Sequence, residues 1–292
     1  MADFTQECLQ EQYANPGYDF DRLSVGGGDE GPPTLSIPSL SATPVIELKE
    51  LDIQRDILPN EGSLNERTGG GRYLIIGRPG SGKSVLMKDI LYYKRDFLPV
   101  ISVVSQTEAF NQFYQGFIPP IFIHDTFRPD IISDFIARQE KVMKRLDYPS
   151  AFGGLILDDC AADCKIMNSK EVENLLKNGR HMNMLVIIAN QYVLDMKPPV
   201  RACFDGVFIL RNSITTDRKK IHDNFASIIP WEDFNRLMNE MTENYGCIFI
   251  NNRSGSNNWQ ECVYVYTAVR RENFDTCCPA ARRFSSDRIN VS

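Results

Sequence analysis

The chain has 292 residues and a formal net charge of −6 at neutral pH, with hydrophobic residues at 42% and charged residues at 24%. This composition is that of an ordinary soluble globular protein, and no apolar run approaches the roughly 20 residues that span a bilayer. We therefore expect no transmembrane segment. The acidic balance excludes general attraction of the chain to nucleic acid, so any contact with DNA has to be local.

Three regions differ in composition. Residues 1–44 contain five prolines and three consecutive glycines at 26–28, which disfavour helices and central strands and predict a flexible N-terminal arm. Residues 45–270 are predicted to form one globular domain. Residues 271–292 include Cys277, Cys278 and Pro279 before a polar finish, and predict a loose C-terminal tail.

Apolar runs and helical patterns alternate through the predicted domain, which indicates an α/β fold with three layers. The predicted strands are residues 73–76, 98–104, 121–124, 154–158, 185–189, 207–210, 247–250 and 262–266. The predicted helices are residues 84–93, 131–146, 216–225 and 230–241, with a further helix that Asn168 and Glu171 would cap and Gly179 would end. We expect a central, mainly parallel sheet with a closing pair of C-terminal strands.

A glycine-rich segment follows the strand at residues 73–76 and opens the first helix. It consists of Gly77, Arg78, Pro79, Gly80, Ser81, Gly82, Lys83 and Ser84. Glycines at these positions let backbone N–H groups close around phosphate oxygens, and the helix directs its positive end at them. The segment predicts a P-loop that binds ATP, with Lys83 on the β- and γ-phosphates and Ser84 on Mg²⁺.

Two adjacent carboxylates end the apolar strand at residues 154–158. Asp158 fits the second protein ligand of Mg²⁺, and Asp159 fits the base that orients the attacking water. Either carboxylate could instead cap the turn that follows. Their pairing with the P-loop favours hydrolysis of ATP.

The strand at residues 185–189 lies between two further polar candidates. Arg180 precedes it, and Gln191 follows it, where the amide would point at the γ-phosphate or at the attacking water. The alternatives are an arginine paired with a surface carboxylate and an amide that only closes a turn.

In these motifs the chain resembles the DNA-packaging ATPases of nucleocytoplasmic large DNA viruses, of the poxvirus and iridovirus type, within the FtsK-HerA class of P-loop translocases. The resemblance covers about residues 70–268. It rests on residues 77–84, 155–159, 180–191, 201–211 and 245–250. The chain departs from many translocases at Asp159, where they carry Glu.

The resemblance implies a ring of identical subunits, which we expect to be a hexamer, that uses ATP and Mg²⁺ to drive double-stranded DNA into a capsid. It implies sequence-independent contacts with DNA, docking on capsid or packaging-vertex proteins, and a location in the viral factory of the host cytoplasm and in the virion. Arg180 matches the arginine that reaches the γ-phosphate of the neighbouring subunit. Arg201 and Arg211 are competing candidates.

Two other functions remain open at this stage. The first is a P-loop nucleotide kinase or another NTPase, although the chain has neither an Asn-Lys-x-Asp guanine-binding segment nor an arginine-rich lid. The second is a structural protein of the virion that has lost turnover, which the intact set of Lys83, Ser84, Asp158 and Asp159 argues against.

Overall fold

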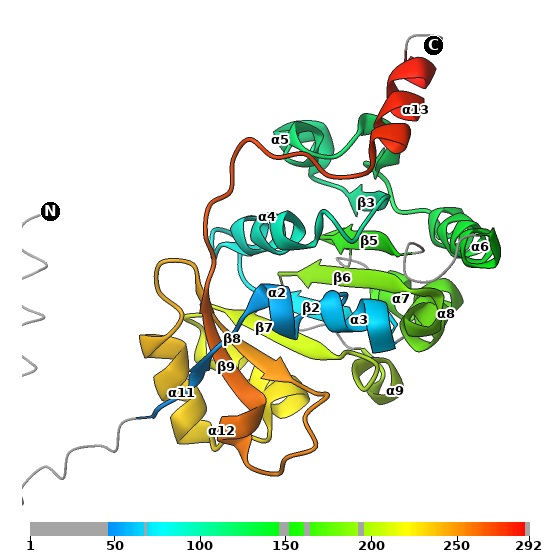
Figure 1. The fold of residues 1–292 in the computed structure, drawn as a ribbon. Helices are drawn as coiled ribbons and strands as arrows, with labels where there is room; N and C mark the ends of the chain where they lie inside the picture. The colour runs from blue at the N-terminus through cyan, green and yellow to red at the C-terminus, as the bar shows by residue number, and fades with distance from the viewer. Residues whose placement is uncertain (1–45, 67–68, 146–151, 161–163, 192–195, 290–292) are drawn as a thin grey trace, which may run out of the picture. The chain divides into compact units, whose positions relative to one another are not determined.

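The computed structural model describes residues 46–66, 69–145, 152–160, 164–191 and 196–289. Its sheet has nine strands: β1 (Lys49–Glu50), β2 (Arg72–Ile76), β3 (Ile101–Ser105), β4 (Ile123–His124), β5 (Gly153–Asp158), β6 (Met184–Asn190), β7 (Gly206–Leu210), β8 (Gly246–Asn251) and β9 (Val263–Thr267). They lie in the order β1-β9-β8-β7-β2-β6-β5-β3-β4 (Figure 1). The arm predicted at residues 1–44 lies outside the described residues.

The sheet is mainly parallel. Strand β8 runs antiparallel to both of its neighbours, β7 and β9, whereas the other neighbouring strands pair in parallel. The α/β fold with a C-terminal strand pair is therefore confirmed. Because parallel strands end at the same edge of a sheet, the residues that follow β2, β3, β5, β6 and β7 all emerge along one edge, which we call the carboxyl edge.

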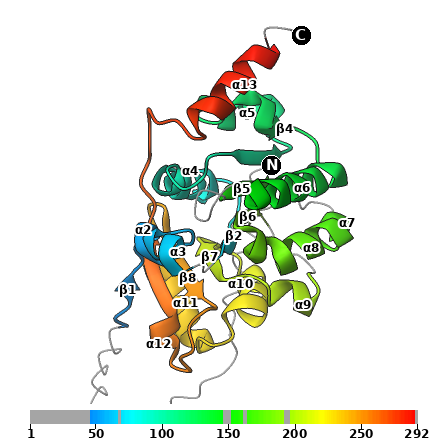
Figure 2. The ribbon, with the colours of Figure 1, turned by 45° about the vertical axis from the view of Figure 1, so that its right-hand side comes forward.

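Helices cover both faces of the sheet (Figure 2). One face carries α2 (Ile53–Asp56) and α4 (Lys83–Lys94), and the other carries α6 (Pro129–Arg145), α8 (Lys170–Asn178), α9 (Pro198–Arg201), α10 (Thr215–Ile221) and α11 (Trp231–Glu240). Further short helices are α3 (Glu61–Glu66), α5 (Glu108–Asn111), α7 (Cys164–Met167) and α12 (Trp259–Cys262). Among the described helices, none combines the length and apolar character needed to cross a membrane.

The central strands are mainly apolar because both faces of the sheet are covered. In β2, Tyr73 and Ile75 pack under α2 and α4, while Leu74 and Ile76 pack on the opposite face with α6 and α8. All four side chains are at most 2% exposed. The central strand that leads into the P-loop is thus held from both sides.

Several predicted boundaries differ from the structure. Strand β3 begins at Ile101 rather than at residue 98, because Pro99 has no N–H to donate to a sheet. Residues 120–122 form a 3₁₀ turn, η2 (Pro120–Phe122), which leaves β4 with two residues. The helix predicted at residues 216–225 consists of α10 followed by a π-helical turn, η5 (His222–Ala226).

The cap of α8 is also one residue later than predicted. Ser169 is the N-cap, and its hydroxyl accepts a hydrogen bond from the Val172 backbone N–H. Asn168 instead accepts a long bond of 3.4 Å from the Lys197 N–H, near the start of α9. Serine and asparagine are equally good caps, so local preference alone did not decide between them.

The segment predicted as a loose C-terminal tail packs on the domain in its described part. Helix α13 (Pro279–Ile289) buries Ala281 in the core, and the Phe274 ring stacks on Phe117 at 5.3 Å. The Cys278 N–H donates to the Pro99 carbonyl oxygen over 2.9 Å. Apolar side chains at irregular spacing carry these contacts, which the polar composition of the segment concealed.

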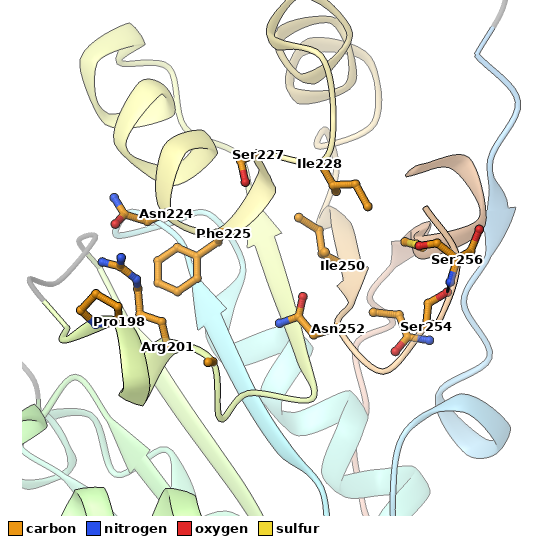
Figure 3. A pocket seen from close by; sticks show the side chains of 13 residues that line it. Pro198, Arg201, Asn224, Phe225, Ser227, Ile228, Ile250, Asn252, Ser254 and Ser256 are labelled. Atoms are coloured by element: carbon orange, nitrogen blue, oxygen red, sulfur yellow. Dashed lines mark hydrogen bonds between the residues drawn. The ribbon is translucent and has the colours of Figure 1, made fainter. Parts of the chain in front are cut away.

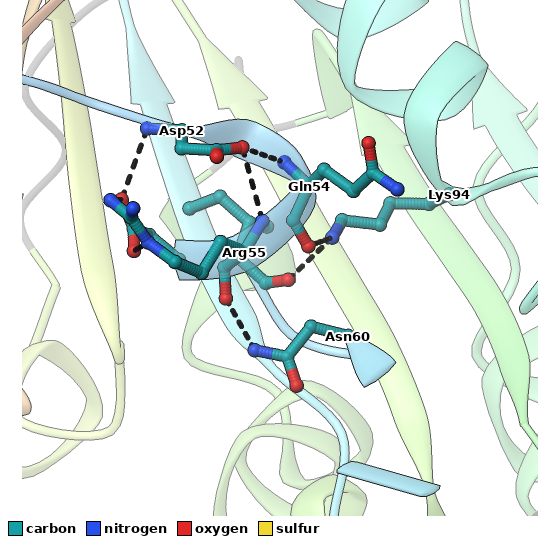
Figure 4. Close-up of polar contacts among 7 residues, drawn as sticks. Asp52, Gln54, Arg55, Asn60 and Lys94 are labelled. Carbon is teal, nitrogen blue, oxygen red and sulfur yellow. Dashed lines mark hydrogen bonds and ion pairs between the residues drawn. The ribbon is translucent and has the colours of Figure 1, made fainter. Parts of the chain in front are cut away.

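A buried lysine ties the helix after the P-loop to α2. Lys94, in the last turn of α4, is fully buried and donates hydrogen bonds to the carbonyl oxygens of Gln54 and Ile57, at 3.0 and 2.6 Å. Figure 4 shows its amine pointing into the turn of α2. Burial lowers the pKa of Lys94 to about 7, although the charges of Asp52 and Asp56 oppose this shift. A neutral amine still has the two protons that these two bonds require.

We expect Lys94 to make stability depend on pH. Between pH 7 and 10 the unfolded chain holds a proton on Lys94 that the folded chain releases, so folding becomes more favourable as pH rises. From pH 7 to pH 9, the unfolding free energy of wild type should rise by about 2 kcal/mol relative to Lys94→Met. Denaturant unfolding at each pH measures this, with Lys88→Met on the same helix as the control. Parallel profiles for wild type and Lys94→Met would contradict it.

Candidate active site

The P-loop forms a tight turn between β2 and α4. Gly80 and Gly82 have backbone φ angles of 77° and 103°, in the left-handed region where glycine carries no penalty. The Gly77 N–H donates to the Asn190 carbonyl oxygen at the end of β6, and the Ser81 hydroxyl donates to the Arg78 carbonyl oxygen over 2.7 Å. These bonds hold the loop in shape at the N-terminus of α4, where helix N–H groups attract an anion.

Lys83, the first residue of α4, folds back across this loop. Its buried amine donates to the Gly77 carbonyl oxygen over 2.9 Å and lies 4.0 Å from the Asp159 Oδ1 atom. Burial lowers the pKa of Lys83, while Asp159 and Asp158 oppose this effect. The predicted P-loop lysine and the two predicted carboxylates therefore come together at the carboxyl edge.

Asp158 ends β5 and is buried. Its burial, and the neighbouring charge of Asp159, raise the pKa of Asp158 to about 6. The Tyr114 hydroxyl donates to Asp158 Oδ2 over 2.9 Å and works against that rise, as does the charge of Lys83. The carboxylate is thus kept in a poorly solvated position, where a cation would stabilise its charge.

Tyr114 is a site residue that the sequence did not reveal. It belongs to a 3₁₀ turn, η1 (Tyr114–Gly116), and its side chain is 1% exposed. The buried carboxylate of Glu108, in α5, accepts hydrogen bonds from the backbone N–H groups of Tyr114 and Gln115. The Tyr114 ring packs against Phe113 and Phe117, with ring centroids 4.8 and 5.8 Å away.

Asp159 and Gln191 meet at the ends of neighbouring strands. The Gln191 Nε2 atom donates to Asp159 Oδ2 over 2.8 Å. Asp159 has a φ of 50°, and its N–H donates to the Ala189 carbonyl oxygen, which turns its side chain toward Lys83. Two neighbouring polar groups are buried without a hydrogen-bond partner among the described residues, namely Asp159 Oδ1 and the Asn190 amide. Such groups are expected where water or a ligand binds.

The residues present fit a magnesium ion. Ser84, exposed at the second position of α4, and Asp158, at the end of β5, supply the hydroxyl and carboxylate oxygens that Mg²⁺ prefers. Asp159, the residue after Asp158, has its Oδ1 atom buried without a hydrogen-bond partner among the described residues. Nearby, the Arg78 guanidinium donates to the Ser213 hydroxyl at 3.1 Å, while Pro79 and Gly80 form the exposed tip of the loop.

The three candidate arginines lie at opposite edges of the sheet. Arg211 directly follows β7 at the carboxyl edge. Its neighbour Leu210 packs on the P-loop, and the Arg211 guanidinium forms an ion pair with Glu243 at 3.2 Å. Arg180 lies in η4 (Gly179–Met182) before β6, and its carbonyl oxygen accepts from the Gly70 N–H before β2. Arg201 ends α9, which precedes β7.

Arg201 also lines a pocket of about 460 Å³ beneath β7 and β8 (Figure 3). The pocket is bordered by the π turn, the end of β8 and the turn after it, with Phe225 and Asn252 facing its interior. Asn252 donates a backbone hydrogen bond to Asp205, the residue before β7. The pocket therefore lies at the opposite edge of the sheet, where β2, β6 and β7 begin, which we call the amino edge. It is separate from Lys83 and the P-loop.

The bond from Tyr114 to Asp158 yields a test of the site without any ligand. We expect Tyr114→Phe to lower the unfolding free energy by about 2 kcal/mol, because a buried carboxylate loses a donor. In an Asp158→Asn background, where the acceptor is uncharged, the same change should cost about half as much. Urea unfolding of the four proteins measures the coupling. Equal losses in both backgrounds would show that the hydroxyl does not act through Asp158.

Comparison with known proteins gives relatives in large DNA viruses. No model of a protein family matches the chain. Protein 075L of Invertebrate iridescent virus 6 is 37% identical over 255 residues, 86% of this chain and 98% of the relative. Protein 015R of Frog virus 3 is 40% identical over 76% of this chain and 69% of the relative. Protein L437 of Acanthamoeba polyphaga mimivirus is 30% identical over 73% of this chain and 78% of the relative. The names of these proteins assign no activity.

Solved structures with a similar fold come from archaeal viruses. The genome packaging NTPase B204 from Sulfolobus turreted icosahedral virus 2, in complex with sulfate, has a TM-score of 0.51 and 16% identity over 70% of this chain and 98% of its own. B204 of Sulfolobus turreted icosahedral virus, a DNA-packaging ATPase, has a TM-score of 0.50 and 15% identity, over 68% of this chain and 98% of the B204 chain. The chain has this fold, and by its sequence it belongs to the family of iridovirus and mimivirus proteins found in the nucleocytoplasmic large DNA viruses.

Proposed function

We propose that this protein is an ATP-driven translocase that packages double-stranded viral DNA into a capsid. One observation carries the proposal: the Lys83 amine, the Asp158 and Asp159 carboxylates and the Gln191 amide meet beside a glycine-rich loop at the carboxyl edge. A lysine, two carboxylates and an amide are the groups that phosphate binding and activation of water require.

Each group has a separate role in hydrolysis. Backbone N–H groups of residues 80–84 hold the phosphates, and Lys83 leaves the Gly77 carbonyl oxygen to hold the β- and γ-phosphates. Asp159, oriented by Gln191, accepts a proton from the attacking water. Ser84 and Asp158 would hold Mg²⁺, which would supply positive charge to the phosphates. After hydrolysis the Gln191 amide senses the loss of the γ-phosphate.

The positions of the arginines favour a ring. Six steps of about 3.3 Å along β6 separate its two ends, so Arg180 lies on the order of 20 Å from the P-loop of its own chain. This separation supports a role for Arg180, and for Arg201 at the same edge, in the site of a neighbouring subunit. Arg211 lies beside its own P-loop, which favours a role within its own site. Head-to-tail contacts of this kind close into rings, for which we propose six subunits.

The remaining parts of the proposal concern the partners. Loops facing the centre of the ring would contact the DNA backbone, which carries no sequence information by itself. Capsid or packaging-vertex proteins would hold the ring while DNA moves. We propose that this takes place in the viral factory of the host cytoplasm, with the protein retained in the virion.

We expect purified protein to hydrolyse ATP, with a rate that rises when double-stranded DNA is added. Lys83→Ala should lower the rate at least about 100-fold, because a donor to the transition state is lost. Lys88→Ala, on the same helix but beside the Phe117 ring, is the matched control and should remain active. Transfer of phosphate to a nucleoside would indicate a kinase instead, and ATP binding without turnover would indicate a structural protein.

The trans-acting arginine is tested by mixing two inactive variants. Lys83→Ala subunits keep the arginine, and Arg180→Ala subunits keep the P-loop, so each should be inactive alone, with a loss of about 10³-fold or more for Arg180→Ala. In a 1:1 mixture about a quarter of the interfaces would combine an intact P-loop with an intact arginine. ATP hydrolysis should return in the mixture. Arg283 is an exposed arginine on α13, and the control variant Arg283→Ala should be active by itself.

No recovery in the mixture would mean that Arg180 acts within its own chain or only in folding. Full activity of Arg180→Ala alone would exclude it. The same mixing experiment with Arg201→Ala would then identify the other amino-edge arginine.

A further inference from the structure

A tyrosine that directly precedes β8, two strands away from β2 in the sheet, packs on the P-loop. Tyr245 precedes β8, and a Cβ atom built on Gly82 would lie 2.7 Å from its Cδ1 atom. The same built Cβ atom would lie 3.5 Å from the Cδ2 atom of Leu210, at the end of β7. Gly82 therefore meets two requirements, since it adopts a left-handed φ and also leaves room for an aromatic ring.

The backbone around Tyr245 is strained in a way that places the ring there. Asn244 and Tyr245 have φ angles of 48° and 67°, and such values are unusual for a bulky side chain. The conformation is held by the Ala268 N–H, which donates to the Tyr245 carbonyl oxygen over 3.1 Å. Strain of this kind persists only where the surroundings enforce it, and it gathers at ligand sites.

An arginine lies against the same ring. The Arg270 guanidinium donates to the Tyr245 hydroxyl, and its Cζ atom lies 5.2 Å from the ring centroid. Arg270 is exposed, whereas its neighbour Arg271 is anchored to the buried Asp89 carboxylate of α4 over 2.7 Å. The chain after β9 thus runs along α4 (Figure 1) and fixes the backbone that presents Arg270.

The direction of a bound nucleotide follows from the site described above. The groups for hydrolysis come from β5 and β6, on one side of β2, so the γ-phosphate lies on that side. The nucleoside at the other end of the triphosphate must leave the P-loop toward β7, β8 and β9. Tyr245 and Arg270 emerge from β8 and β9 at the same carboxyl edge.

From this arrangement we infer that Tyr245 and Arg270 form the subsite for the nucleotide base, which stacks on the tyrosine ring beside the planar guanidinium. Aromatic rings and guanidinium planes both stack on nucleobases. The inference rests on the proposed function, because it requires a triphosphate in the P-loop. It adds that part of the affinity for ATP comes from the base.

Calorimetric titration of the full chain with two magnesium complexes, those of ATP and of inorganic tripolyphosphate, separates the base from the phosphates. Tyr245→Ala should weaken ATP binding about tenfold, equivalent to about 1.4 kcal/mol, and change tripolyphosphate binding less than about twofold. Tyr245→Phe keeps the ring and should bind ATP within about threefold of wild type. Arg270→Ala should bind ATP about threefold more weakly and bind tripolyphosphate as wild type does. Arg253 is exposed, and Arg253→Ala is the control.

Each result has a separate meaning. Equal losses of ATP and tripolyphosphate in Tyr245→Ala would make the ring a support of the P-loop and overturn the base subsite. Unchanged ATP binding would overturn it as well. In both cases the P-loop itself would stand, provided that Lys83→Ala weakens both ligands. If wild type bound neither ligand, the proposed function and the base subsite would fail together.

Discussion

The site depends on one constraint, which is the parallel alignment of β2, β5, β6 and β7. Because these strands end at one edge, residues more than 100 positions apart in the sequence, such as Gly77 and Asn190, meet there. The Gly77 N–H bonded to the Asn190 carbonyl oxygen continues the register of β2 and β6 into the P-loop. Burial of β2 on both faces then holds the loop, and with it Lys83, in place.

The same packing explains the electrostatics of the site. Lys83 and Asp158 are both buried, and burial lowers the pKa of the amine and raises that of the carboxyl. Beside them, the Asp159 Oδ1 atom lies 4.0 Å from the Lys83 amine and has no hydrogen-bond partner among the described residues. These buried charges support the proposal that the site binds a ligand carrying both phosphate and a cation, such as the complex of Mg²⁺ with ATP.

Sequence reasoning located the residues that follow strands well and the supporting contacts poorly. Gly77 to Ser84, Asp158 and Gln191 could be placed because an apolar strand and a polar end are adjacent in the chain. Tyr114 could not be placed, because its contact with Asp158 spans 44 positions and depends on a turn that Glu108 organises. Helix α13 was missed for a similar reason, since its packing depends on tertiary contacts and not on a periodic apolar face. The amino-edge arginines were named, but only the sheet order separates them from Arg211.

The central claim is that a nucleotide at this edge is hydrolysed by one subunit with help from the next. The most direct test is an electron cryomicroscopy structure of the full chain with double-stranded DNA, Mg²⁺ and a slowly hydrolysed ATP analogue. The account predicts a closed ring around DNA, with the γ-phosphate between Lys83 and Asp159 and an amino-edge arginine of the adjacent subunit beside it. A nucleotide site completed within one subunit, or an analogue bound away from residues 77–84, would contradict the account.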